Sequence, residues 1–218
     1  MKQSRTEGLR EEVAKFKAWA AVAFPEDQHG EWETEYEEWD GLYNAATCVL
    51  RQDAAWTDEE INLLLYAVAR DNETELLAGQ VPNDRLLLFA RAALISEERD
   101  AKWQLVIRLP QLSWNAEIEE LLLLFAADES EYVRRRAMLA LADCKSVHAE
   151  RLAEAAWETG EQYQRIAALH ALHKVNSGLL QGYLQLADKD GRQFVVKNAQ
   201  DIRQQHGDKS VGYQDPPT

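Results

Sequence analysis

The feature that most constrains the fold is a segment that recurs at a spacing of 31 residues. Residues 131–141 (EYVRRRAMLAL) align with residues 162–172 (QYQRIAALHAL), so that a tyrosine, an arginine, two alanines and a leucine coincide. A further shift of 31 places Phe194 under Tyr163, and Asp190 then falls at the position of Asp128. A period near 30 leaves room for two helices per unit, and such units stack because one helix pair alone leaves its apolar face exposed. The repeat therefore predicts an α-solenoid.

The rest of the chain also favours helices over strands. Leucine and alanine dominate, runs of alternating β-branched residues are lacking, and loop signals recur at short intervals. Thr57 and Glu60 match a capping box, which predicts a helix start there. We predict an all-α fold of stacked antiparallel helix pairs in one domain, residues 1–205. Its parts are acidic, aromatic N-terminal helices (1–56), divergent helix pairs (57–113) and three regular repeats (114–205), followed by a flexible tail (206–218).

Residues 128–141, DESEYVRRRAMLAL, resemble a HEAT repeat, specifically the short HEAT-like repeats of about 30 residues. The matching residues are Asp128, Val133, Arg134, Ala137 and Leu141 in one unit and Arg165, Ala168 and Leu172 in the next. Thr159 and Gln164 depart from the pattern, in place of its aspartate and valine. The resemblance implies a right-handed superhelix and structural roles for these residues. It also implies that Arg134 pairs with a carboxylate or carbonyl of a neighbouring segment.

The three consecutive arginines could instead form a basic patch for nucleic acid. Arg135 and Arg136 follow Arg134 at about 100° steps around a helix, so the three cannot share one face. Glu129 and Glu131 lie near enough to compensate part of the charge. We interpret the run as structural and solvent-exposed, with contact to a partner as the alternative for Arg135.

The chain is strongly acidic, with 38 Asp and Glu against 24 Lys and Arg and a net charge of −14. Such a field repels nucleic acids and anionic membranes and favours a basic protein partner. Within residues 26–40, EDQHGEWETEYEEWD, the aromatic residues fall at helical spacing and continue as one apolar stripe. The members of this stripe are Trp32, Tyr36, Trp39, Tyr43, Ala46 and Leu50. We expect the stripe to pack on the first helix, and the flanking acids to be either a solvated face or a partner surface.

Two groups of residues are the candidates for partner binding. The acidic group is Glu31, Glu33, Glu35, Glu38 and Asp40. The second group lies on the second helix of each repeat and comprises Tyr132, Arg135, Met138 and Tyr163.

Motifs for chemistry are lacking: we find no glycine-rich phosphate loop, nucleophile elbow or zinc-ligand spacing. We therefore expect no catalytic residues, no metal and no cofactor, and interpret His170 and His173 as surface or half-buried residues. Two distant cysteines suggest buried thiols in a reducing compartment. The N-terminus lacks a signal-peptide layout, and no apolar run approaches the length of a membrane span. We expect a cytoplasmic protein.

These observations favour a non-enzymatic protein-binding module, for which a toxin-neutralising immunity protein and an adaptor are two possible forms. One alternative is an enzyme-associated protein, because proteins similar to HEAT repeats include some that attach bilin chromophores and others that excise alkylated DNA bases. Another is a structural subunit that assembles with copies of itself. The oligomeric state stays open.

Overall fold

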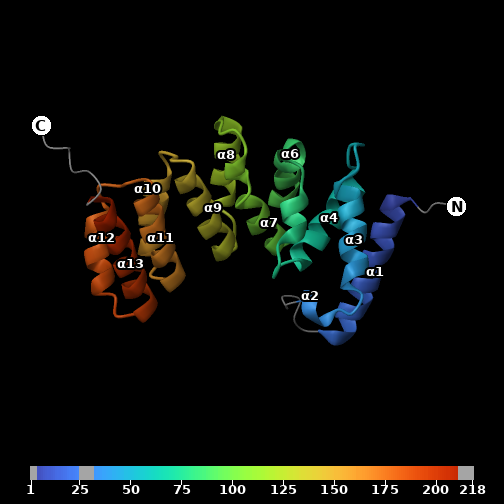
Figure 1. Cartoon of the computed structure of the whole chain (residues 1–218), viewed down its shortest axis with the longest axis horizontal. Helices are drawn as coiled ribbons and strands as arrows, with labels where there is room; N and C mark the ends of the chain where they lie inside the picture. Colours follow the sequence, from blue (N-terminus) through green and yellow to red (C-terminus); the bar gives the residue numbers. More distant parts are fainter. Residues whose placement is uncertain (1–3, 25–31, 211–218) are drawn as a thin grey trace, which may run out of the picture. The chain divides into compact units, whose positions relative to one another are not determined.

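The computed structural model describes residues 4–24 and 32–210, apart from the side chains of residues 33, 34 and 206–210. Within these ranges every regular element is a helix and no β-strand forms (Figure 1). The all-α prediction is therefore confirmed. The chain divides into two compact units, Met1–Ser113 (unit 1) and Trp114–Thr218 (unit 2).

The first three helices of unit 1 contribute rings to one aromatic cluster. The described elements of unit 1 are α1 (Arg5–Ala23), α2 (Trp32–Glu35), α3 (Trp39–Leu50), α4 (Asp58–Arg70), α5 (Leu76–Gln80), α6 (Asn83–Leu94), α7 (Arg99–Val106) and the 3-10 helix η1 (Leu109–Gln111). Helix α1 packs on α3, α3 on α4, and α4 on α7. The ring of Phe16 in α1 lies 5.8 Å from Trp32, 4.9 Å from Tyr36 and 6.3 Å from Trp39 between centroids. The predicted packing of the aromatic stripe on the first helix is confirmed.

The stripe does not, however, lie on one continuous helix. Helix α2 ends at Glu35, Tyr36 is not helical, and α3 begins at Trp39. The break lets the Tyr36 ring bury against Phe16 and Trp19, where it is only 6% exposed. It also interrupts a run of carboxylates that would repel one another along a helix.

The predicted capping box is present at the start of α4. Glu60 N donates to Thr57 Oγ1 at 3.2 Å, and Thr57 N donates to Glu60 Oε2 at 2.8 Å. Two otherwise unpaired N–H groups at the helix start are thereby satisfied.

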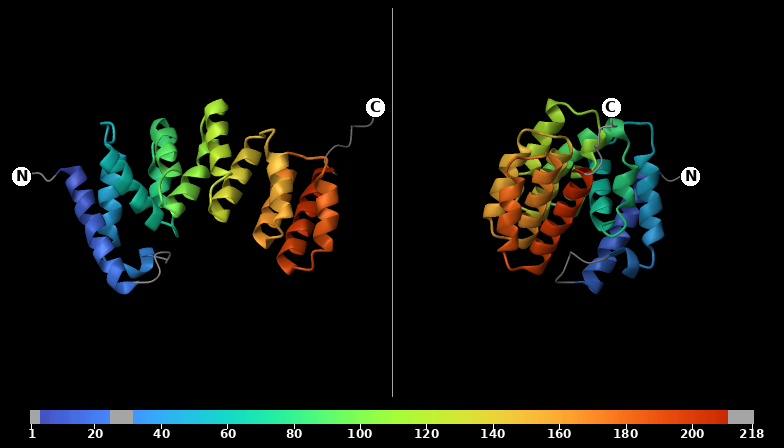
Figure 2. Two further views of the ribbon diagram at one scale, coloured as in Figure 1. Left: turned by 180° about the vertical axis from the view of Figure 1, so that it is seen from behind. Right: turned by 60° about the vertical axis from the view of Figure 1, so that its left-hand side comes forward.

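Unit 2 consists of helices that follow one another through short loops. They are α8 (Ala116–Phe125), α9 (Glu131–Asp143), α10 (Ala149–Glu158), α11 (Gln162–Lys174), α12 (Leu180–Asp188) and α13 (Gln193–Ser210). Contacts join α8 to α9, α10 to α11 and α12 to α13, and they also join α9 to α11 and α11 to α13 (Figures 1 and 2).

The 31-residue sequence spacing returns in the geometry of unit 2. Lys145 and Asn176 have φ of 58° and 53° in one set of loops, and Gly160 and Gly191 have φ of 77° and 80° in the other. The repeated alanines of α9, α11 and α13 (Ala137, Ala168 and Ala199) are all fully buried, as are the predicted structural residues Val133, Leu141 and Leu172. Small buried side chains let neighbouring helices approach closely.

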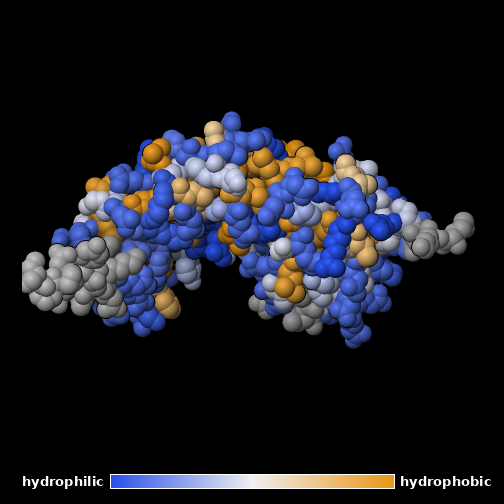
Figure 3. Space-filling model, turned by 45° about the horizontal axis from the view of Figure 1, so that its top comes forward, coloured by the Kyte–Doolittle hydropathy of each residue, from blue (hydrophilic) through white to orange (hydrophobic). Residues whose placement is uncertain are grey.

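Residues 206–210 of the predicted tail continue α13, and residues 211–218 lie outside the described ranges. The face drawn in Figure 3 shows apolar residues in small patches among hydrophilic ones. None of the described helices combines the length and the apolar character needed to cross a membrane.

Candidate protein-binding surfaces

A hollow of about 600 Å³ opens on unit 1 beside α1. We term it the acidic hollow, and its lining residues are Lys15, Ala18, Trp19, Glu35, Tyr36, Glu37 and Glu38. The break between α2 and α3 creates its acidic side, because Glu37 and Glu38 lie in the turn that joins the two helices.

The floor of the acidic hollow is aromatic. The rings of Trp19 and Tyr36 lie 4.9 Å apart and are inclined at 45°. Burial raises the pKa of the Tyr36 hydroxyl, and the carboxylates of Glu38 and Glu12 raise it further. The hydroxyl therefore stays protonated and neutral at physiological pH.

The negative charge at the rim is only partly compensated within the described part of the chain, because Lys15, whose ammonium pKa is raised chiefly by Glu12, also lies near enough to the Glu38 carboxylate for its pKa to be raised further. Glu35, Glu37 and Glu38 are exposed and form no salt bridge with any described residue. The cation at the hollow, Lys15, pairs with Glu12 at 2.7 Å between Nζ and Oε1. Exposed carboxylates beside aromatic rings suit a lysine or arginine side chain, which gains ion pairs and a cation–π contact together.

The predicted acidic group is thus partly gathered in one place. Glu35 and Glu38 line the hollow, whereas Asp40 is exposed in the first turn of α3. Glu31 and the Glu33 side chain lie outside the described residues. Glu37, one of the acids expected to flank the aromatic stripe, also lines the hollow, because the chain turns there between α2 and α3.

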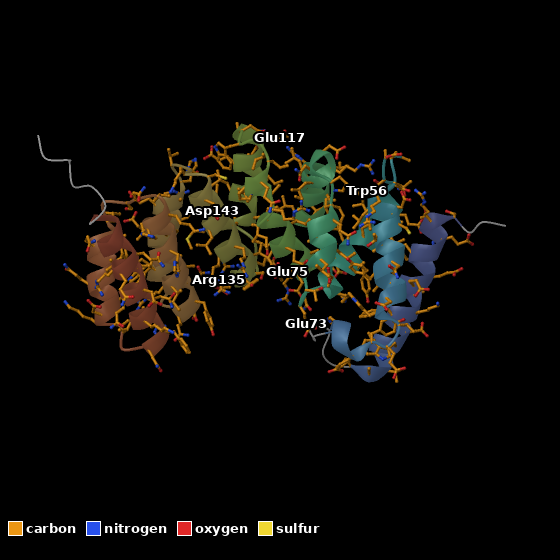
Figure 4. All side chains as sticks on the ribbon, in the orientation of Figure 1. Trp56, Glu73, Glu75, Glu117, Arg135 and Asp143 are labelled. Carbon is orange, nitrogen blue, oxygen red and sulfur yellow. The ribbon has the colours of Figure 1, made fainter. Side chains whose placement is uncertain are left out.

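A second surface combines an arginine with tyrosines from two successive repeats. Figure 4 labels Arg135 on α9. Its guanidinium carbon lies 4.7 Å from the Tyr132 ring centre and 5.1 Å from that of Tyr163 on α11. Its Nε also lies 3.6 Å from a Glu131 carboxylate oxygen. The Tyr163 residue is 60% exposed. The structure therefore brings together Tyr132, Arg135 and Tyr163.

Met138 does not belong to this surface, and its assignment to partner binding was wrong. It is 3% exposed and lines a small pocket with Leu152 and Gln164, whose wall also includes the exposed residues Ala155 and Thr159. Phe194 on α13 is the exposed residue that the prediction missed, at 57%. It occupies the repeat position of Tyr132 and Tyr163, so the alignment itself contained the signal.

The predicted structural residues form one recurring turn contact. Asp128 Oδ1 accepts from Ser130 N at 2.8 Å, Thr159 Oγ1 from Glu161 N at 3.2 Å, and Asp190 Oδ1 from Arg192 N at 3.4 Å. Each oxygen thus binds the N–H two residues ahead, and threonine substitutes for aspartate in this role.

The arginines of the repeat anchor these turns. Arg134 donates to the backbone carbonyls of Asp128 and Glu129 at 2.8 and 2.7 Å. Arg165 donates to the carbonyl of Trp157 at 3.2 Å and to the Asp190 carboxylate. Hydrogen bonds from Arg192, the largest effect, and from Arg165 hold the pKa of Asp190 well below its usual range despite burial.

The described residues offer little for metal chemistry. They contain no group of three or more His, Cys, Asp or Glu side chains that could hold a metal ion. His170 bonds Asn198 Oδ1 through Nε2 at 2.9 Å. Cys48 is exposed and Cys144 is half-buried, so the prediction of two buried thiols was wrong.

Comparison with known proteins returned no match: no family model, no curated protein and no solved structure is similar to this chain. The geometry of the chain itself therefore carries the functional argument.

Proposed function

We propose that this chain is a non-enzymatic protein-binding module that receives a basic protein partner. The acidic hollow is the observation that carries this proposal. It gathers three exposed carboxylates, Glu35, Glu37 and Glu38, beside the rings of Trp19 and Tyr36, and none of the three forms a salt bridge with a described residue. A lysine or arginine of the partner inserts there, and the net charge of −14 accelerates the encounter.

We further propose that the chain is built as a HEAT-like α-solenoid with a right-handed superhelix. The recurring turn contacts at Asp128, Thr159 and Asp190 support a tandem repeat. The buried alanines at 31-residue spacing support stacked helix pairs.

The Tyr132, Arg135 and Tyr163 surface supplies a second contact area. Tyrosine and arginine are enriched among residues that dominate binding energy, and a guanidinium already held between two rings loses little freedom on binding. A toxin-neutralising immunity protein and an adaptor in the cytoplasm are the forms of this function that we propose. Both would occlude or organise a basic domain without performing chemistry.

A charge-reversal experiment tests the proposal directly. The test variant carries Glu35→Lys, Glu37→Lys and Glu38→Lys. The matched control reverses three exposed acids of unit 2, Glu120→Lys, Glu129→Lys and Glu158→Lys, so both variants shift the net charge of −14 by the same six units. Each protein is used to capture partners from an extract of the source cell at low and high salt, followed by mass spectrometry.

We expect the wild-type chain and the control to retain the same basic protein at low salt and to lose much of it at high salt. The test variant should bind that protein about tenfold more weakly or worse. Equal retention by the test variant and the control would remove the acidic hollow from the interface. Circular dichroism should show unchanged helicity in both variants.

Self-assembly is the second candidate, and the charge distribution within unit 2 favours it. Helices α8 and α10 carry six glutamates and one arginine, whereas α9 and α11 carry five Arg and Lys and two acids. Arg165 and Lys174 already pair with Asp190 and Asp143 within the chain, so pairing between two copies would use the remaining charges of these helix sets. Sedimentation velocity over a concentration series at low and high salt checks this: a mass independent of both would exclude it.

A further inference from the structure

A cavity of about 470 Å³ in unit 1 differs from the acidic hollow in charge. Its lining residues are Lys17, Ala20, Ala21, Phe24, Trp32, Tyr66, Arg70 and Glu98. Helix α1 contributes to both sites, with Lys15, Ala18 and Trp19 at the hollow and Lys17, Ala20 and Ala21 at the cavity. We term this second site the Tyr66 cavity.

Two cations share one aromatic ring in the Tyr66 cavity. The Lys17 Nζ lies 4.4 Å from the Tyr66 ring centre, and the Arg70 guanidinium carbon lies 4.2 Å from it. Arg70 also pairs with Glu98, at 2.6 Å between Nη1 and Oε2. Lys17 forms no ion pair with any residue that the structure describes. The cavity therefore keeps one excess positive charge inside a strongly acidic protein.

The cavity wall also includes a buried donor without an acceptor. Trp32 is 2% exposed, and its indole Nε1–H has no hydrogen-bond partner in the described part of the chain. Leaving such a donor unpaired is costly, and most buried polar groups in proteins have a partner.

We propose that the Tyr66 cavity binds a small organic anion, namely a carboxylate or phosphate carried on a flat apolar body. The anionic group pairs with Lys17 and lies near the Arg70 guanidinium, while the body packs between Phe24, Trp32 and the alanines of α1. A volume of about 470 Å³ lies within the range of small-molecule sites. The site is separate from the acidic hollow and goes beyond the proposed binding of a basic protein.

The indole signal of Trp32 provides a direct readout. In proton–nitrogen correlation spectra of the full chain, the Trp32→Phe variant identifies this signal among those of the seven tryptophans. The probes are phenylacetate and phenyl phosphate, with neutral phenylacetamide as the matched control and inorganic phosphate as the headgroup alone. We expect a saturable shift of the Trp32 signal with the two aromatic anions, and at least about tenfold weaker binding of the amide.

Substitutions of two nearby lysines distinguish binding in this cavity from a general effect of losing one positive charge. Lys17→Met should weaken phenylacetate binding about tenfold, whereas Lys15→Met should leave it unchanged, because Lys15 is paired with Glu12 at the acidic hollow. Both side chains are exposed on α1, so both variants should fold. The proposal is overturned if the Trp32 signal does not respond to either aromatic anion, if the amide binds equally well, or if the two lysine variants behave alike.

A peptide that ends in phenylalanine with a free carboxylate distinguishes the source of the anion. Tighter binding of this peptide than of phenylacetate would assign the cavity to a protein C-terminus. Tighter binding of phenylacetate would assign it to a free small molecule. Because Glu35, Glu37 and Glu38 lie outside this cavity, their reversal should leave phenylacetate binding intact, so the two proposals can fail independently.

Discussion

Arg165 on α11 reaches the loop before α13, where its Nη1 lies 2.5 Å from Oδ2 of Asp190. The Asp190 side chain is fully buried, and Arg192 donates to the same carboxylate at 2.5 Å. The pair thus connects the helices of two successive repeats through one carboxylate. A buried carboxylate is stable only with such partners, so this contact holds the loop in place.

Replacing Asp190 with asparagine should destabilise unit 2. The substitution removes the charge that both arginines neutralise, and we expect the free energy of unfolding to fall by about 2 kcal/mol. Asp188→Asn is the matched control: it breaks the exposed pair with Arg203 at 2.7 Å and should cost less than about 1 kcal/mol. Urea unfolding followed by circular dichroism measures both, and equal costs would contradict a structural role for the buried carboxylate.

The contribution of Asp190 should also depend on pH in a defined direction. Because the pKa of Asp190 is lowered in the folded state, the unfolded chain binds a proton more readily at acidic pH. The stabilisation is complete above the unfolded pKa of about 4 and is lost as the pH falls towards the folded pKa. The difference between wild type and Asp190→Asn should therefore be constant from pH 7 to about pH 5 and shrink below it. A difference that grows towards acidic pH would contradict the lowered pKa.

Two glycines in equivalent loops should respond alike to alanine. Gly160 and Gly191 have φ of 77° and 80°, and no atom lies within 4 Å of an added Cβ at either position. The cost of Gly→Ala is therefore conformational, and we expect about 1 kcal/mol at each. Gly182→Ala in α12 meets the same open space but a helical backbone, so it should stabilise the chain by about 0.5–1 kcal/mol. Thermal unfolding measures all three variants: the melting temperature should fall for Gly160→Ala and Gly191→Ala and rise for Gly182→Ala.

The capping box of α4 extends into a larger network than its sequence motif implies. Burial alone would raise the pKa of Glu60, yet hydrogen bonds from Thr57, Thr6 and Gln52 lower it overall. Glu60→Ala should cost about 2 kcal/mol, because it leaves these donors without their acceptor. The neighbouring Glu59, which pairs with Arg10 on the surface, provides the control. Glu59→Ala should lower the free energy of unfolding by less than about 1 kcal/mol. If Glu60→Ala lowers it by no more than Glu59→Ala does, Glu60 acts only as a local cap.

Helical periodicity accounts for much of what could be predicted of the fold. The 31-residue spacing marked Ala137 and Ala168, which are fully buried, and it placed Asp128 and Asp190 in equivalent turns. These features are local or recur regularly, so they can be recognised from a single sequence. Thr57 and Glu60 were recognisable for the same reason, since a capping box spans only four residues.

The candidate sites were harder to predict because they depend on breaks and on contacts between distant segments. Helical spacing extended one stripe through Tyr36, whereas the chain leaves the helix there and forms the acidic hollow. Met138 faces the interior although its neighbours on α9 reach the surface. The Tyr66 cavity joins Lys17 to Arg70, and no motif links residues at that separation.

The stacked guanidinium of Arg135 leads to a last prediction about the second contact area. Arg135→Lys keeps the positive charge but loses the flat group that stacks between Tyr132 and Tyr163. We expect the partner captured by the wild-type chain to be released at lower salt, while the free energy of unfolding changes by less than about 1 kcal/mol. Tyr163→Phe keeps the ring and should retain the partner as wild type does. If Arg135→Lys retains the partner equally well, the stacked arginine serves the packing of α9 on α11 and not the interface.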